Sequence, residues 1–217
     1  MSLWRFQTGG EMPLPFSRLQ CHSRRGGDLC FVDSPVVLAT VGLSQKAGQS
    51  SLCLWDTLLP PSRALIAACS AHAEGGRCVV HSPADQSLVS GGDKGELVVF
   101  DLRQHRIREQ WRAHNSPVQA LIQMDGKGCF SADSDGDLKL WNTTSLHVTT
   151  NSNEECVAIP LAHRPCAHEP HSLLAPLVGS RAGRTGINSL QPTSYPAIGL
   201  LTGGGDGRVK YWPVGLV

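Results

Sequence analysis

The sequence has no excess of charge of either sign and no long apolar run. Its 217 residues contain 19 Lys and Arg against 18 Asp and Glu, a formal net charge of +1. This balance removes the electrostatic reason to expect nucleic acid or an anionic membrane as the main partner. No run of about 18 apolar residues occurs, so no segment is expected to span a bilayer. The first residues, MSLWRFQTGG, lack the pattern of a signal peptide, which predicts a cytoplasmic protein.

The cysteines do not have the character of a disulfide framework. Cys30, Cys53, Cys78 and Cys129 lie in the apolar stretches DLCFV, LCLW, RCVV and GCF. Free cysteine behaves as a small buried hydrophobe, whereas disulfide frameworks serve shorter chains in oxidising compartments. We therefore predict reduced thiols in a core.

Five segments of the chain end on an aromatic residue in the same way. SLWRF, LCLWD, LVVFD, LKLWN and VKYWP place this residue at Trp4, Trp55, Phe100, Trp141 and Trp212. The intervals from Trp55 to Phe100 and from Phe100 to Trp141 are 45 and 41 residues. They match the roughly 40–45 residues of a WD-repeat propeller blade, and the two outer intervals match it with insertions.

Turn and histidine positions recur before these aromatic residues. SADSDGDLKLWN (131–142) and TGGGDGRVKYWP (202–213) align without a gap, and SGGDKGELVVFD (90–101) has its turn displaced by one residue. Asp-Gly between two apolar runs predicts a tight hairpin, because the turn needs residues that tolerate positive φ. His22, His72 and His114 each lie upstream of one of the aromatic residues.

These repeats predict an all-β fold of about four WD-repeat β-propeller blades. Each blade should have four antiparallel strands, with the fourth crossing into the next blade. The chain should begin in the middle of a blade and form part of a larger or incomplete ring, since seven blades need about 290 residues. We expect one propeller region over residues 1–217, with an irregular loop or divergent blade at about 143–200.

The same landmarks resemble the WD-repeat family, in which His, a strand Ser or Thr, a turn Asp and Trp form a hydrogen-bonded network inside a blade. The resemblance implies a structural set of His114, Ser131, Asp135 and Trp141. It implies a weaker set of His72, Ser90 and Asp93, because Phe100 has no indole N–H to donate. Trp55, Asp206 and Trp212 are the matching residues in the other repeats.

Two chemical alternatives compete with this structural interpretation. His114, Ser131 and Asp135 could be taken for a catalytic triad, but recurrence at blade spacing favours buried polar groups that satisfy one another. Cys156, His163, Cys166, His168 and His171 could suggest zinc or His/Cys chemistry in the 151–175 loop. Their spacing fits no ordinary structural zinc pattern. We therefore predict no enzyme activity, metal, cofactor or small-molecule substrate.

Several longer segments are similar to the C-terminal WD repeats of DmX-like proteins, also called rabconnectins. They are SLWRFQ, QCHS (20–23), LCLWDTLLPP (52–61), SGGDKGELVVFDLRQ (90–104) and WRAHNSPVQAL (111–121). The resemblance implies a non-catalytic scaffold that promotes assembly of the vacuolar-type proton pump, acidifies endosomes and synaptic vesicles, and binds Rab regulators. It also implies peripheral association with those membranes through partners. The alternative is a generic WD-repeat adaptor or peptide-recognition module unrelated to the pump.

Overall fold

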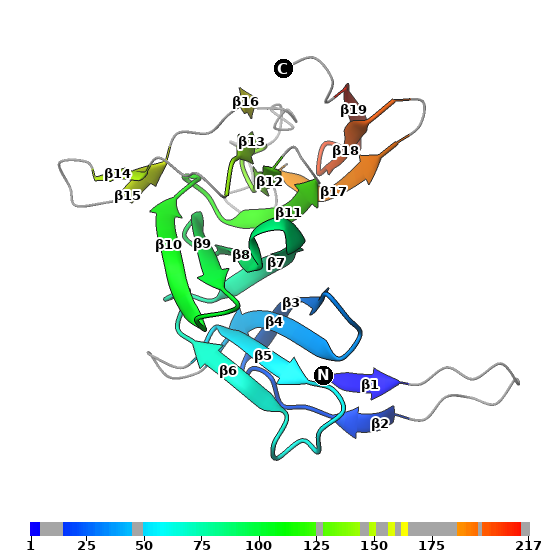
Figure 1. Cartoon of the computed structure of the whole chain (residues 1–217). Helices are drawn as coiled ribbons and strands as arrows, with labels where there is room; N and C mark the ends of the chain where they lie inside the picture. The colour runs from blue at the N-terminus through cyan, green and yellow to red at the C-terminus, as the bar shows by residue number, and fades with distance from the viewer. Residues whose placement is uncertain are drawn as a thin grey trace, which may run out of the picture.

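The computed structural model is an arc of antiparallel β-sheets that follow one another along the chain (Figure 1). It describes residues 1–4, 15–44, 50–124, 128–143, 148–150, 156–158, 162–164, 186–194 and 197–213. The first two strands lie at one end of the arc and the last three at the other.

Three sheets have four strands each. Blade 1 contains β3 (Arg25–Val32), β4 (Val37–Leu43), β5 (Leu52–Asp56) and β6 (Leu65–Cys69). Blade 2 contains β7 (Gly76–Ser82), β8 (Ser87–Gly92), β9 (Glu96–Asp101) and β10 (Arg106–Arg112), with the 3-10 turn η1 (Pro83–Asp85). Blade 3 contains β11 (Val118–Met124), β12 (Gly128–Asp133), β13 (Leu138–Trp141) and β16 (Ala162–Arg164).

Smaller sheets complete the described part of the chain. Blade 4 has three strands, β17 (Ile187–Thr193), β18 (Gly199–Gly204) and β19 (Val209–Pro213). An N-terminal half-blade has β1 (Ser2–Trp4) paired with β2 (Pro15–Arg18), and β14 (Val148–Thr150) pairs with β15 (Cys156–Ala158). The prediction of an all-β fold made of propeller blades is confirmed.

In blades 1 to 3 the fourth strand remains in its own blade, so the expected crossing of this strand into the next blade is wrong. Strand β6 pairs with β5, and β10 pairs with β9, both antiparallel. The connections 57–64 and 102–105 are short, and a short connection between antiparallel strands folds the chain back on itself. The crossing to the next blade comes after the fourth strand.

A β-bulge recurs at the start of the first strand in all four blades. The pairing register shifts between Gly26 and Asp28, between Gly76 and Cys78, and at matching places in β11 and β17. The residues skipped by the ladder include Arg77 and Gln119. Because a bulge redirects one side chain, it can turn these polar groups toward a neighbouring blade.

Apolar side chains on opposite faces of each sheet join one blade to the next. Ala39 and Val41 of blade 1 share a cluster with Val79 and Leu88 of blade 2. Further clusters join blades 2 and 3, blades 3 and 4, and the half-blade and blade 1. Alternation along a strand sends successive residues to opposite faces, so each interior sheet contributes to two interfaces.

Candidate functional site

Blade 3 contains a buried polar network around one serine. His114 Nε2 lies 2.6 Å from Ser131 Oγ, and Trp141 Nε1 donates to the same oxygen at 2.7 Å. Ser131 has no accessible surface, and His114 and Trp141 are buried. Trp141 also packs edge-to-face on Trp111 of blade 2, with ring centroids 5.4 Å apart. The structure thus brings three of the four predicted residues together.

The acid beside His114 is Asp133, and the prediction of Asp135 in this place is wrong. Asp133 Oδ2 lies 3.2 Å from His114 Nδ1, while its Oδ1 accepts the backbone N–H groups of Asp135 and Asp137 at 3.0 and 2.8 Å. Asp135 is exposed at the tip of the turn. Strand β12 continues through Asp133, so this residue is still inside the blade when the turn begins.

Blade 2 repeats the arrangement with a different acid. His72 Nε2 lies 2.8 Å from Ser90 Oγ, as the repeat predicts, but His72 Nδ1 lies 2.8 Å from Glu96 Oε1. Asp93, the predicted acid, instead forms ion pairs with Arg25 at 2.7 Å and with Arg77. Glu96 is the first residue of β9, the strand after the turn, whereas Asp133 of blade 3 lies before its turn. The longer glutamate side chain reaches the imidazole from there.

Blades 1 and 4 use threonine at the serine position. Thr40 Oγ1 accepts from Trp55 Nε1 at 2.9 Å and lies 3.1 Å from His22 Nε2. Thr202 Oγ1 accepts from Trp212 Nε1 at 3.0 Å. Asp206 Oδ1 accepts the backbone N–H of Arg208, as the Asp of a turn does.

Sequence reasoning missed Asp133, Glu96 and Thr40 because it followed the Asp-Gly turn rather than the strands. The signal that could have found the acids is an acidic residue at the end of the second strand, eight positions before the aromatic residue, or at the start of the third strand, four positions before it. Asp133 precedes Trp141 by eight residues, and Glu96 precedes Phe100 by four. Only the fold shows that both positions face an imidazole.

Burial sets the protonation of two of the imidazoles, those of His22 and His114. Loss of solvent contact lowers the pKa of His114, and the nearby Asp133 carboxylate opposes this effect without reversing it. Burial likewise lowers the pKa of His22. His114 therefore stays neutral near pH 7, and its contact with Ser131 holds the ring in place.

A second polar network runs between blades at one end of their first strands. Asp93 follows β8 of blade 2 and bridges Arg25 of blade 1 and Arg77 of its own blade. Arg77 Nη1 donates to Gln119 Oε1 of blade 3 at 2.7 Å, and Gln119 Nε2 donates to Ser134 Oγ at 2.6 Å. Arg77 and Gln119 are the bulge residues, so the recurring bulge couples three blades.

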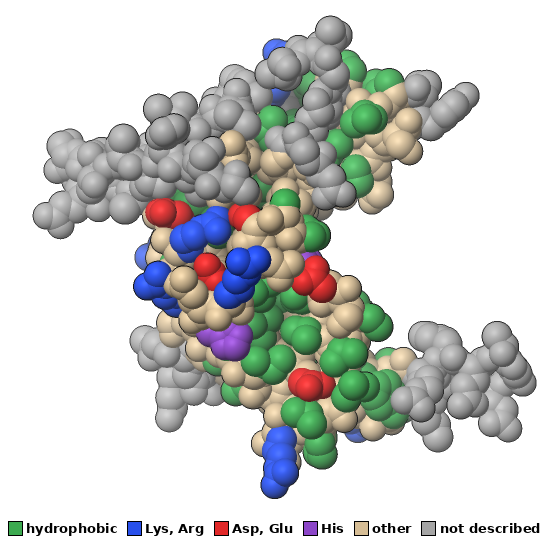
Figure 2. Space-filling view, in the orientation of Figure 1, with side chains coloured by type: hydrophobic (Ala, Val, Ile, Leu, Met, Phe, Trp, Pro, Cys, Tyr) green, Lys and Arg blue, Asp and Glu red, His purple; other side chains and the backbone are tan. Residues whose placement is uncertain are grey.

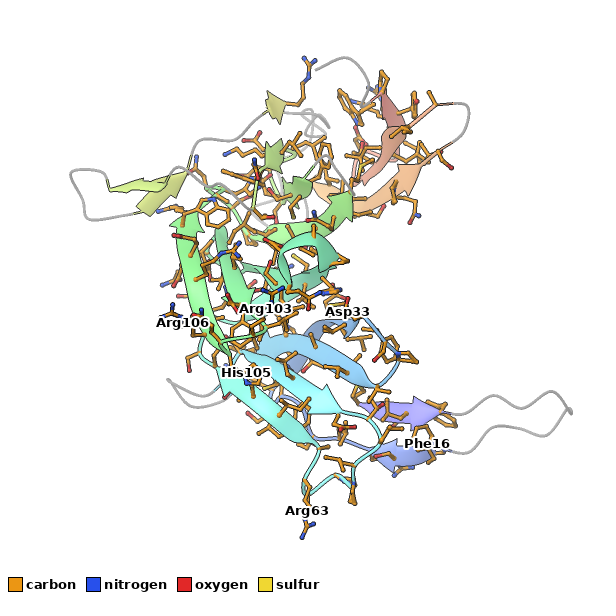
Figure 3. All side chains as sticks on the ribbon, in the orientation of Figure 1. Phe16, Asp33, Arg63, Arg103, His105 and Arg106 are labelled. Atoms are coloured by element: carbon orange, nitrogen blue, oxygen red, sulfur yellow. The ribbon has the colours of Figure 1, made fainter. Side chains whose placement is uncertain are left out.

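The basic residues near the β9–β10 turn divide into two kinds. Arg103, His105 and Arg106 project at the turn (Figure 3). Arg108 instead forms an ion pair with Asp85 at 2.9 Å. The exposed side chains of Arg103, His105 and Arg106 are typical of a solvated surface rather than of a buried site.

The described cysteines are free thiols. Cys53, Cys78 and Cys129 are buried, whereas Cys30 is partly exposed. Burial raises the pKa of Cys53 and of Cys129 to about 12. A thiol held neutral is a poor nucleophile and metal ligand, so these residues serve packing.

Among the residues whose side chains are described, no group of three His, Cys, Asp or Glu could hold a metal. The zinc candidates Cys156, His163, Cys166, His168 and His171 lie outside those residues. No helix in the described ranges is long and apolar enough to cross a membrane.

Comparison with known proteins identifies the repeat. The family model "WD domain, G-beta repeat" matches residues 106–142, from β10 to the residue after β13. DmX-like protein 1 from Mus musculus is 36% identical over 148 residues, which is 66% of this chain and 5% of that protein. DmX-like protein 1 from Homo sapiens is 36% identical over 138 residues, 63% of this chain and 4% of that protein. The chain is a WD-repeat region of the DmX-like family.

Solved structures agree on the fold of this DmX-like region. It superposes on the computationally designed Ika8 protein with a TM-score of 0.63 and 18% sequence identity. The superposition covers 93% of this chain and 50% of that one. At this identity the likeness concerns the fold alone. Since WD repeats present rigid loops and edges to other proteins, the region has the architecture of a protein-interaction module.

Proposed function

We propose that this DmX-like region is a non-catalytic scaffold that contributes to assembly of the vacuolar-type proton pump, and so to acidification of endosomes and synaptic vesicles. Subunits of the pump and regulators of a Rab GTPase are its proposed partners. The proposed location is the cytoplasm, with peripheral attachment to vesicles through these partners. The DmX-like relatives support the proposal, and the chain spans about one twentieth of their length.

One observation supports a non-catalytic role most directly. Ser131, whose hydroxyl lies beside His114 Nε2, is fully buried and accepts the Trp141 N–H. A nucleophilic serine must reach a substrate carbonyl, and an oxygen enclosed between an indole and an imidazole cannot. Thr40 has the same pair of contacts in blade 1. The repetition indicates blade construction.

Affinity capture from a vesicle-rich lysate tests the proposed partners, with quantitative mass spectrometry as the readout. The matched control is the same chain with Ser131→Val, which removes the acceptor of both His114 and Trp141 and should disrupt blade 3. Enrichment of pump subunits over the control supports the proposal, and binding of the purified cytosolic sector of the pump confirms direct contact. Capture of other folded partners without pump subunits would reject the pump and favour a generic WD-repeat adaptor.

A further inference from the structure

The fourth strand of blade 1 is an edge of its sheet. Strand β6 pairs with β5 on one side, and no strand in the described part of the chain pairs with its other side. Leu65 and Ile66 are 50% and 41% exposed, and Ala68 is exposed as well. The outer strands of the two neighbouring blades, β2 and β10, belong to the described chain, so the exposure of this edge does not depend on further blades.

Strand β6 lacks the protection that the other outer strands have. Edge strands commonly avoid pairing with other chains through charged residues, proline or a very short length. The other outer strands of the described chain show these features: Pro15 and Arg18 in β2, Arg106, Arg108, Glu109 and Arg112 in β10, and a length of three residues in β16. The sequence of β6, LIAAC, has neither charge nor proline over five residues. Figure 2 shows the same contrast, with hydrophobic side chains gathered over the lower part of the molecule and charged ones over blade 2.

The chain itself closes the matching edge of blade 2. In both outer strands the pairing register shifts after the residue opposite the aromatic, which leaves Ile66 in β6 and Arg108 in β10 at the same place. Arg108 forms an ion pair with Asp85 and donates to the carbonyl oxygen of Thr143, and β15 lies beside β10. Strand β15 belongs to the connection between the third and fourth strands of blade 3. In blade 2 this connection is only residues 102–105, which is too short to place a strand along β6.

Two copies of β6 fit one another when they run antiparallel. Pairing centred on Ala67 places this residue opposite Ala67 of a second copy. Each large side chain then faces a small one, Ile66 facing Ala68 and Leu65 facing Cys69. Cross-strand neighbours lie close enough to pack, no two charges meet, and the edge groups of both backbones gain partners. The contact uses the same surface on both copies, which is the geometry of a twofold dimer.

We propose that the open edge of β6 pairs with β6 of a second copy, so that two four-stranded sheets join into one and the protein forms a twofold dimer. An open edge presents a row of backbone N–H and C=O groups, and another extended strand satisfies such a row. The second copy supplies a strand that is uncharged and of matching side-chain size. Leu58 and Leu59, exposed in the connection before β6, extend the apolar surface beside it.

Sedimentation velocity of the purified 217-residue protein, from low micromolar to several hundred micromolar concentration, measures the association. We expect the wild-type protein to dimerise as its concentration rises. Ala68→Lys places a charge on the open edge and should weaken dimerisation by about tenfold or more, as the loss of a central contact does. Gln110→Lys is the matched control, because Gln110 is exposed and pairs with Val98 as Ala68 pairs with Cys53. The control should dimerise like wild type.

Cross-linking of introduced cysteines tests the register and does not depend on the stability of Ala68→Lys. Ala67→Cys brings two thiols opposite one another in the dimer, so a mild oxidant should link the copies. Glu109→Cys, the matching substitution in β10, and wild type, which has only the native thiols, should remain unlinked. A wild-type monomer at every concentration would overturn the proposal and leave β6 to a strand of another protein. Undiminished dimerisation of folded Ala68→Lys, or equal cross-linking of Ala67→Cys and Glu109→Cys, would overturn it too.

Discussion

Separate replacement of Asp133 and of Asp135 by alanine tests which acid stabilises the polar network of blade 3. The two acids are two residues apart, with Asp133 at the end of β12 and Asp135 in the turn that follows. Of the two, only Asp133 is buried, accepts two backbone N–H groups and approaches His114. A hydrogen bond to a charged group contributes about 1.5–3 kcal/mol, and a backbone N–H left without its acceptor costs about 1–3 kcal/mol. These effects overlap, so we expect Asp133→Ala to lower the free energy of unfolding by about 2–4 kcal/mol.

Asp135→Ala serves as the internal control. Its side chain is exposed, and surface substitutions usually change stability by less than about 0.5 kcal/mol. Asp133→Asn should fall between the two, since its amide oxygen can still accept one backbone N–H while the negative charge is lost.

Urea unfolding followed by tryptophan fluorescence measures these differences, and thermal melting provides a second measure. A loss of about 2–4 °C per kcal/mol is typical of a domain of this size, so Asp133→Ala should melt roughly 5–15 °C below wild type. Equal melting temperatures for Asp133→Ala and wild type would refute the reasoning. So would an Asp135→Ala variant that is the less stable of the two, because that result would return the network acid to the turn.

Three other predictions concern the protonation of the buried histidines, the ion pairs between blades 1 and 2, and the accessibility of the buried thiols. Burial lowers the pKa of His22 and His114 in the folded state, so the unfolded state binds protons first as the pH falls. The stability that these residues contribute is complete above about pH 7 and should fall as the pH drops through about 6.5. Melting temperatures between about pH 5.5 and 7.5 check this, and His114→Gln should flatten the dependence of melting temperature on pH. Asp93→Ala should increase hydrogen exchange where blades 1 and 2 meet without unfolding either blade, and unchanged exchange there would rule out a coupling role. Cys78 and Cys129 should react with a thiol reagent only after unfolding, and rapid labelling of native protein would contradict their burial.

The positions of the blades follow from local sequence patterns. The third strand of each of blades 1 to 3 ends at its aromatic residue or one residue later: β5 at Asp56, β9 at Asp101 and β13 at Trp141. These ends could be predicted because alternating apolar runs and the turns between them are properties of a few neighbouring residues. The pairing of His72 with Ser90 and of His114 with Ser131 follows from the resemblance to the WD-repeat family, because each histidine precedes the first strand of its blade and each serine lies on the second strand.

Tertiary structure decided which groups complete those pairs. Asp133 and Glu96 face imidazoles because of strand register and the place where each strand ends or begins, and the Asp-Gly motif contains no information on either. Asp93 meets Arg25, 68 residues away, only because a bulge and a blade interface bring them together. Local chemistry therefore determined the strands and turns, and packing between distant segments determined the polar contacts.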